Sequence, residues 1–122
     1  MCQEFKIENE LIPQIASCFA GGIGNTGTVC GAVIGATMAI GIKKGRGETK
    51  EEMLRTLSIA QEFRSRFETE MGTIICRELT GADLSTEDGI EQFMNSDVPQ
   101  KVCFPAVATA YRIVMDMLKG AS

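Results

Sequence analysis

The stretch CGAVIGATMAIGIKK, residues 30–44, decides the fold of this chain. Gly31, Gly35 and Ala39 recur within it at every fourth position. Residues four apart share one face of a helix, so this spacing predicts a helix with a flat surface of small residues that another backbone can approach closely. Glycine inside a helix costs roughly 1 kcal/mol relative to alanine, so the interior glycines indicate a packing or site function. Close contact with a second helix is the simpler of these explanations, and the two are compatible.

Further helices are predicted on both sides of this stretch. The loop GGIGNTG at residues 21–27 ends a first helix, and the hydroxyl of Thr26 or Thr28 is expected to cap the helix that follows. Thr49 and Glu52 form a T-x-x-E capping box, which is typical of a helix start. The predicted elements are a first helix from about residues 7–9 to 19, a second from about 26–30 to 44, a third at about 49–71, a short helix or turn at 74–79, a helical piece at 85–94, a loop at 98–103 and a last helix at about 105–119.

The sequence shows no alternating strand pattern of any length. We therefore predict an all-α fold, a small bundle of about four to five helices with a glycine-rich loop between the first two, and a single domain over residues 1–122. A length of 122 residues with 44% hydrophobic and 23% charged residues suits one soluble core. The apolar run at residues 30–42 is shorter than the roughly 20 residues of a membrane-spanning helix, so no span is predicted.

The composition excludes several classes of function. The net charge of −4 provides no basic footprint, so nucleic acid is not an expected partner. The absence of histidine excludes histidine-based catalytic triads and histidine ligands to zinc or haem. The first ten residues, MCQEFKIENE, lack the basic segment and apolar run of a signal peptide. We therefore expect a cytoplasmic protein, in which thiols rest in the reduced state.

Five cysteines carry the remaining chemistry: Cys2, Cys18, Cys30, Cys76 and Cys103. They form no C-x-x-C pair, so the thioredoxin, zinc-ribbon and ferredoxin patterns are missing. The odd number argues against a framework in which every cysteine is paired. For any one of them the alternative is a structural role, because free cysteine packs as a small hydrophobic residue.

Cys30 is the leading candidate for a reactive thiol. It follows the glycine loop at the predicted start of a helix, where free backbone N–H groups and the positive end of the helix dipole stabilise a thiolate. Such a thiolate can be nucleophilic, redox-active or metal-ligating. Cys76 is followed by Arg77, which can stabilise a thiolate by folding back, and Arg77 is also expected to form an ion pair with Asp83 that fixes Cys76. Cys103 lies just before the last helix.

The glycine loop contains a literal G-x-G-x-x-G formed by Gly22, Gly24 and Gly27. As a cofactor-binding signal it is weak, because the dinucleotide fingerprint requires a strand before the loop and a helix is predicted there. A connection between two helices, in which the glycines supply positive φ angles, is the simpler explanation.

Two longer stretches resemble the C_GCAxxG_C_C family of redox-active proteins. The first is FAGGIG at residues 19–24 with VCGAVIGATMAIG at residues 29–41, which includes a C-G-A-x-x-G core. The second, FETEMGTIICRELTGADL at residues 67–84, is similar to the family's F-x-x-x-x-G-x-x-x-C-R-E-L-x-G-x-D-L segment. The resemblance covers about residues 10–118. It implies a helical, cysteine-centred redox or metal protein.

The family pattern has four cysteines, of which this chain matches three, namely Cys30, Cys76 and Cys103. The first family cysteine belongs to an N-terminal helix well upstream of the glycine loop. Either Cys2 or Cys18 takes its place, or this chain lacks that helix or begins at an internal start. If that helix is missing, the apolar face that it would bury is left exposed. Association of two copies around a two-fold axis is the simplest way to bury such a face, so we expect a homodimer.

Three functions remain open at this point. In a thiol redox protein, which requires no cofactor, Cys30 attacks and Cys76 or Cys103 resolves the intermediate as a disulfide. In a metal or Fe–S protein, the same three thiolates bind zinc or a cluster together with Cys18, an exogenous ligand or a partner's cysteine. In a non-catalytic helical module, the cysteines only pack, and the chain serves a membrane transporter or a redox partner protein. The first two require the three family cysteines to lie together.

Overall fold

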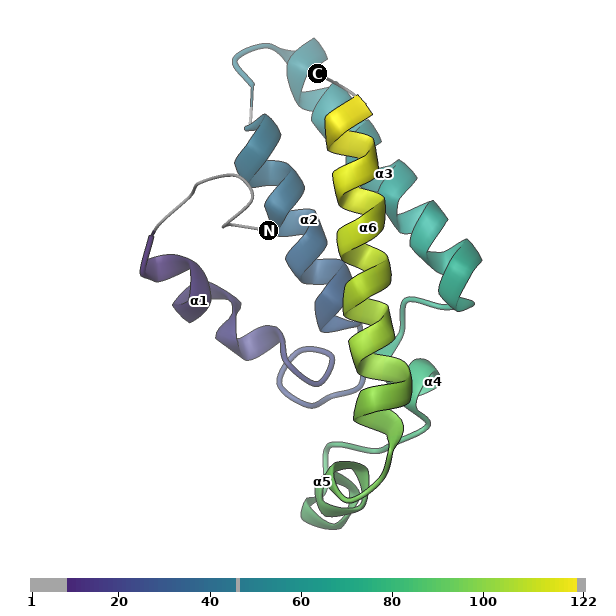
Figure 1. Cartoon of the computed structure of the whole chain (residues 1–122). Coiled ribbons are helices and arrows are strands. Elements are labelled where there is room, and N and C mark those ends of the chain that lie inside the picture. Colours follow the sequence, from purple (N-terminus) through teal and green to yellow (C-terminus); the bar gives the residue numbers. More distant parts are fainter. Residues whose placement is uncertain (1–8, 46, 121–122) are drawn as a thin grey trace.

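Three long helices lie side by side and form the body of the structure (Figure 1). The computed structural model describes residues 9–45 and 47–120. The long helices are α2 (Gly31–Lys44), α3 (Lys50–Met71) and α6 (Phe104–Gly120), and each packs against the other two. The shorter elements are α1 (Leu11–Ala16), a 3-10 turn η1 (Ser17–Phe19), α4 (Cys76–Thr80), α5 (Glu87–Met94) and a π-helical turn η2 (Pro99–Cys103).

The predicted all-α class is confirmed. Residues 9–45 and 47–120 contain six α-helices and no strand, and a single antiparallel bridge joins Val29 to Ile75. The helix beyond the predicted four to five is α4, which forms where the sequence predicts a short helix or turn. Within the same described ranges, no helix combines the length and apolarity that crossing a bilayer requires.

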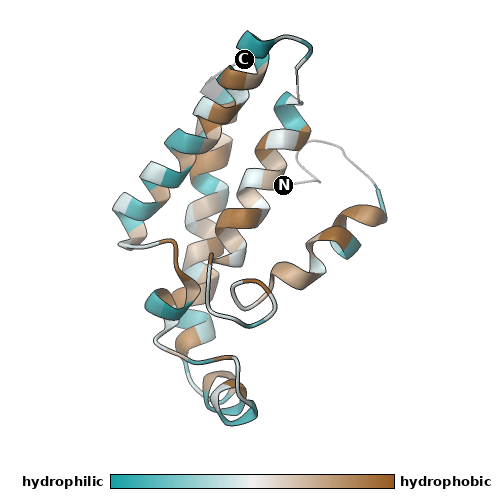
Figure 2. Cartoon of the chain, turned by 180° about the vertical axis from the view of Figure 1, so that it is seen from behind, coloured by the Kyte–Doolittle hydropathy of each residue, from teal (hydrophilic) through white to brown (hydrophobic). Residues whose placement is uncertain are grey.

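The core fills the space between the three long helices. Phe63 and Phe67 of α3 are 0% exposed, and their ring centroids lie 6.0 Å apart. The hydrophilic residues of α3 lie on its outer side (Figure 2). The other buried members of this cluster are Val33, Ala36 and Ile40 of α2 and Ala106, Ala110, Ile113, Val114 and Leu118 of α6.

The small-residue face of α2 is only partly buried in this bundle. Ala36 and Ala39 are buried, but Gly35 is exposed, and no atom of residues 9–45 and 47–120 outside its own helix turn lies within 4 Å of the place where its Cβ would stand. The close helix contact that the spacing predicts is therefore absent at Gly35. A Cβ added to Gly31 would lie 3.6 Å from the carbonyl oxygen of Phe19.

The predicted caps are correct for α3 and wrong for α2. The hydroxyl of Thr49 accepts a hydrogen bond from the Glu52 N–H at 3.1 Å, as the capping box requires. At α2 the N-cap residue is Cys30, without a side-chain cap. The hydroxyls of Thr26 and Thr28 instead donate to the carbonyl oxygen of Gly22, at 2.7 and 2.6 Å. They stabilise the loop rather than the helix because the loop folds back on itself before α2 begins.

The loop predicted at residues 98–103 is wrong, because Pro99–Cys103 forms a π-helical turn that continues directly into α6. The N–H of Phe104 donates to the carbonyl of Pro99, five residues earlier. Pro105 has no N–H for the usual bond to residue 101, and its ring would clash with that carbonyl in a regular α-helix. A wider turn before Pro105 relieves this conflict.

Candidate thiol site

A short backbone pairing brings Cys30 next to Cys76. The bridge between Val29 and Ile75 is closed by two hydrogen bonds, from the Cys30 N–H to Ile74 at 2.7 Å and from the Cys76 N–H to Thr28 at 2.6 Å. In this antiparallel pairing Cys30 is opposite Ile74, so Cys76 is its diagonal neighbour on the same face. Two cysteines that lie 46 positions apart in the sequence thus meet at the starts of α2 and α4.

The glycine loop makes this approach sterically feasible. Gly22 is buried with φ +73°, and a Cβ added to it would stand 2.8 Å from the Cβ of Cys76. Gly27, with φ +73°, would place its Cβ 3.0 Å from the Cβ of Arg77. Two of the three glycines of the G-x-G-x-x-G therefore let the loop pack against the start of α4. Gly24 has open space around it, and a helix and a 3-10 turn, rather than a strand, precede the loop.

Cys103 reaches the same region from the other end of the chain. It is the last residue of the π-helical turn, which contacts α4. A π-turn places its residues at a different angle around the axis than an α-turn would, and such turns recur at functional sites. The elements that carry the three family cysteines, namely the start of α2, α4 and the turn before α6, therefore lie around the lower end of the bundle in Figure 1.

Cys30, Cys76 and Cys103 line one cavity of about 750 Å³. Its walls come from the glycine loop, the start of α2, α4, α5, the π-turn and the start of α6. The apolar lining includes Leu79, Leu84, Ile90, Phe93, Met94, Pro99, Val102, Phe104, Ala106 and Val107. A volume of this size falls in the range of about 300–1,000 Å³ that is typical of small-molecule sites.

Two of the three thiols are held in the protonated form. Burial raises the pKa of Cys76, and negative charge on Cys30 raises it further, whereas a hydrogen bond from the Thr80 side chain opposes the rise. Burial also raises the pKa of Cys103, with added repulsion from charge on Cys76 and then on Cys30. A charge on Cys30 thus acts on both other thiols, and a charge on Cys76 acts on Cys103.

This coupling predicts a pH dependence of stability. A thiol whose pKa is raised by folding holds its proton more tightly in the folded protein than in the unfolded chain. Its contribution to the free energy of unfolding is complete below the ordinary thiol pKa of about 8.5 and is lost as the pH rises through the raised value. Urea unfolding at neutral pH and at increasing alkaline pH should show this decline. The decline should be shallower in Cys76→Ala and unchanged in Cys18→Ala, and equal slopes in all three proteins would contradict the assignment.

The remaining candidate residues lie outside the cavity. Cys18 is exposed, follows α1 in the 3-10 turn and has the hydroxyl of Ser17 4.0 Å from its sulfur. Cys2 lies outside the described residues. Arg77 forms the predicted ion pair with Asp83, with 3.3 Å between Nη2 and Oδ1 and both side chains more than half exposed. Hydrogen bonds from Ser85 and then the charge of Arg77 hold the pKa of Asp83 below its usual value.

The metal hypothesis receives no support from the ligand geometry. In residues 9–45 and 47–120, no group of three or more Cys, Asp or Glu side chains has an arrangement that could hold a metal ion. The three cysteines therefore share a cavity without forming a preassembled coordination site.

Sequence reasoning missed the part of the site that α5 supplies. Ile90, Phe93 and Met94 line the cavity from one face of this helix, while Glu87, Asp88 and Glu91 are exposed. Spacings of three and four between apolar residues in EDGIEQFM were the available signal. Thr80, whose side chain bonds to Cys76, carried no such signal, because a threonine near a helix end has many uses.

The comparisons with known proteins identify the family of the chain. A family model described as "Putative redox-active protein (C_GCAxxG_C_C)" matches residues 1–117 of the chain. Neither the curated proteins nor the solved structures contain a match.

Proposed function

Because the chain belongs to the redox-active C_GCAxxG_C_C family, we propose that it transfers electrons by thiol–disulfide exchange, with Cys30 as the attacking residue and Cys76 as the resolving residue. The observation that carries this proposal is the shared cavity, in which a backbone bridge holds these two residues as neighbours. Cys103 is the third thiol of the group and the alternative resolving residue.

The reaction balances as an exchange of two electrons. The Cys30 thiolate attacks one sulfur of an acceptor disulfide, forms a mixed disulfide and releases one thiolate. Cys76 then gives up its proton and attacks the sulfur of Cys30, which releases the second thiolate and leaves a Cys30–Cys76 disulfide. The acceptor gains two electrons and two protons as two thiols, and the protein loses them.

The positions of the thiols support these roles. Cys30 is the N-cap residue of the 14-residue helix α2, where the helix dipole favours negative charge. Cys76 and Cys103 have raised pKa values, so they rest as thiols until a mixed disulfide forms beside them. A protein of this kind suits the cytoplasm, where a redox partner protein or a transporter-associated partner would reduce it again.

Peptide mapping after mild oxidation tests the proposal. The reduced protein is treated with hydroxyethyl disulfide, blocked with iodoacetamide and digested. We expect loss of two thiols and recovery of a peptide pair joined through Cys30 and Cys76. A Cys30–Cys103 peptide would overturn the resolving role of Cys76, and mixed disulfides confined to Cys18 would overturn the proposal as a whole.

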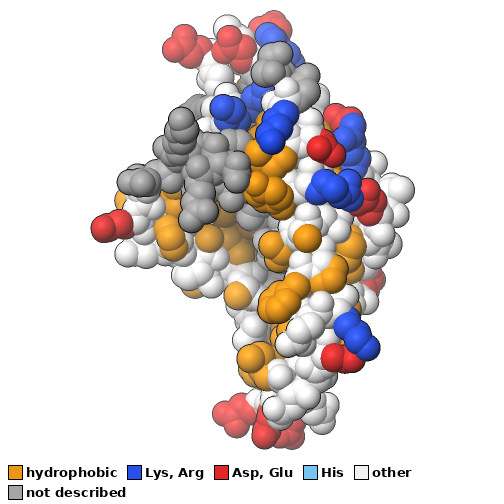
Figure 3. Space-filling model, viewed as in Figure 1, with side chains coloured by type: hydrophobic (Ala, Val, Ile, Leu, Met, Phe, Trp, Pro, Cys, Tyr) orange, Lys and Arg blue, Asp and Glu red, His pale blue; other side chains and the backbone are white. Residues whose placement is uncertain are grey.

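We also propose that the homodimer expected from the sequence forms through α1. No residue of α1 is buried, and Leu11 and Ile15 are 57% and 62% exposed. A second hollow, lined by apolar and small residues that include Ile12, Gly35 and Val107, separates α1 from α2 and α6. Hydrophobic side chains follow α1 beside it (Figure 3). A hollow and an exposed apolar helix edge on one surface are self-complementary, which is what a two-fold interface requires.

Sedimentation at micromolar concentration tests this association. The expected species has twice the 13.2 kDa mass of the chain. Ile15→Asp should return it to the monomer mass, whereas Leu57→Asp, which changes a leucine on α3 that is also about half exposed (51%), should leave the dimer intact. A monomeric wild-type protein, or dissociation by the second substitution alone, would contradict the proposed interface.

A further inference from the structure

We propose that the thiol cavity selects an uncharged, apolar disulfide of low molecular mass as its electron acceptor. This inference rests on the proposed function and adds the class of substrate. It starts from what lines the cavity, since the walls that surround a reactive sulfur determine which molecules can approach it.

Charge is missing from the cavity wall. The described residues that line it include no Asp, Glu, Lys or Arg, and its polar side chains are Asn25, Thr80 and Gln100 besides the three thiols. A charged substrate entering this space would lose hydration without gaining an ionic partner. An apolar substrate would lose unfavourable hydration instead. The wall therefore discriminates against charged disulfides before the thiols react.

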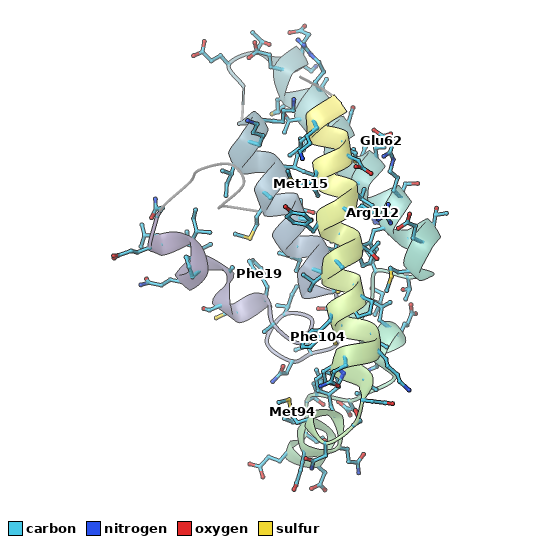
Figure 4. All side chains as sticks on the ribbon, viewed as in Figure 1. Phe19, Glu62, Met94, Phe104, Arg112 and Met115 are labelled. Atoms are coloured by element: carbon cyan, nitrogen blue, oxygen red, sulfur yellow. The ribbon has the colours of Figure 1, made fainter. Side chains whose placement is uncertain are left out.

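The entrance of the cavity is also apolar. Met94 at the end of α5 and Phe104 at the start of α6 both line the cavity, and they are 67% and 63% exposed. They lie on the same side of the lower end of α6 (Figure 4). Large apolar side chains exposed at the mouth of a cavity offer the first contact to an apolar molecule.

Helix α5 lines the cavity and contributes no residue to the core cluster. None of its residues is buried, and its apolar residues face the cavity instead of the bundle core. The core cluster is complete without any residue of this helix. We therefore attribute the apolar face of α5 to the cavity that it lines and not to packing in the bundle core. A substrate that fills this space covers Ile90 and Phe93 while its sulfur atoms reach Cys30.

The experiment compares two chromogenic disulfides, the neutral 4,4′-dithiodipyridine and the dianionic 5,5′-dithiobis(2-nitrobenzoate). Two full-length variants are used. In Cys2→Ser/Cys18→Ser only the cavity thiols remain, and in Cys2→Ser/Cys30→Ser/Cys76→Ser/Cys103→Ser only the exposed Cys18 remains. The ratio of the neutral to the dianionic rate constant is measured for each by stopped flow. The second variant corrects for the intrinsic reactivity of the reagents and for the net negative charge of the protein.

The ratio should be at least about tenfold larger for the cavity thiols than for Cys18. It should persist in about 1 M salt, which screens long-range repulsion but not exclusion from an apolar space. Met94→Lys in the first variant should raise the dianionic rate about two- to threefold at low salt, and Leu57→Lys on α3 should not. Equal ratios for the two variants, or a ratio abolished by salt, would overturn the proposed selectivity.

The same measurement separates this inference from the proposed function. Exchange between Cys30 and Cys76 releases two pyridinethione groups per protein and leaves no adduct, which mass spectrometry detects as a loss of two hydrogens. If that disulfide forms while the ratios are equal, only the substrate class is wrong. If the cavity thiols retain stable adducts and form no internal disulfide, the proposed function itself fails.

Discussion

Replacing Cys30 by serine should reduce the rate of thiol–disulfide exchange by at least about a thousandfold. Serine is close to cysteine in shape, but its hydroxyl does not ionise near neutral pH and does not form a disulfide. Cys76 and Cys103 cannot replace it as attacking groups, because burial raises the pKa of both. The measurement is the rate of internal disulfide formation with hydroxyethyl disulfide, followed by mass spectrometry.

The matched control is Cys18→Ser, which changes an exposed thiol outside the cavity and should leave the rate unchanged. Urea unfolding of both variants separates chemistry from packing. If Cys30→Ser retains the exchange rate and only loses stability, the cysteine serves packing, and the hypothesis of a non-catalytic helical module replaces the redox proposal. A variant that folds normally and no longer forms the disulfide supports the redox role.

The second large effect is expected from Gly22→Ala. The glycine has φ +73°, and an added Cβ would lie 2.6 Å from the backbone nitrogen of Thr28 and 2.8 Å from the Cβ of Cys76. The left-handed backbone costs a non-glycine residue about 1–2 kcal/mol, and overpacking adds about 1–3 kcal/mol. The free energy of unfolding should therefore fall by about 2–5 kcal/mol, and the Cys30–Cys76 disulfide should form more slowly because Cys76 must move.

Gly24→Ala is the control for this substitution. Gly24 has φ +60°, but beyond its two chain neighbours no atom of the described residues lies within 4 Å of its added Cβ, so only the backbone cost of about 1–2 kcal/mol applies. Urea denaturation of the two variants isolates the contribution of the close contacts at Gly22, with the Thr28 backbone and with Cys76. Equal losses of stability, with equal exchange rates, would show that the close packing of the loop against α4 does not support the site.

The sequence predicted the long helices better than the connections between them. Thr49 and Glu52 marked the start of α3 because a helix cap depends on residues three positions apart. The π-turn before α6 was missed, since it results from a conflict between Pro105 and the preceding turn that only the three-dimensional path reveals. The threonines before α2 were assigned to a cap, although their hydroxyls bond to Gly22 within the loop.

In the site, too, the features that depend on neighbouring residues were predicted, whereas those that depend on contacts between distant parts of the chain were not. Cys30 at a helix start followed from neighbouring residues alone. Its proximity to Cys76 depends on a backbone bridge between segments far apart in the chain, and no local pattern encodes that pairing. The spacing of the apolar residues in α5 was visible in the sequence, but the cavity that they line was not. That cavity exists only after α4, α5 and the π-turn are placed around it.

The π-turn before α6 also sets the angle around the helix axis between the side chains of the turn and those of α6. One residue corresponds to about 100° of rotation around a helix axis. Ala106 and Ala110 face the bundle core while Cys103, a few residues earlier, faces the thiols of the other segments. Deleting one residue between Pro99 and Cys103 would keep all three cysteines but rotate the residues before the turn relative to the core face of α6. The number of residues between Pro99 and Pro105 therefore matters to the cavity as well as their identities.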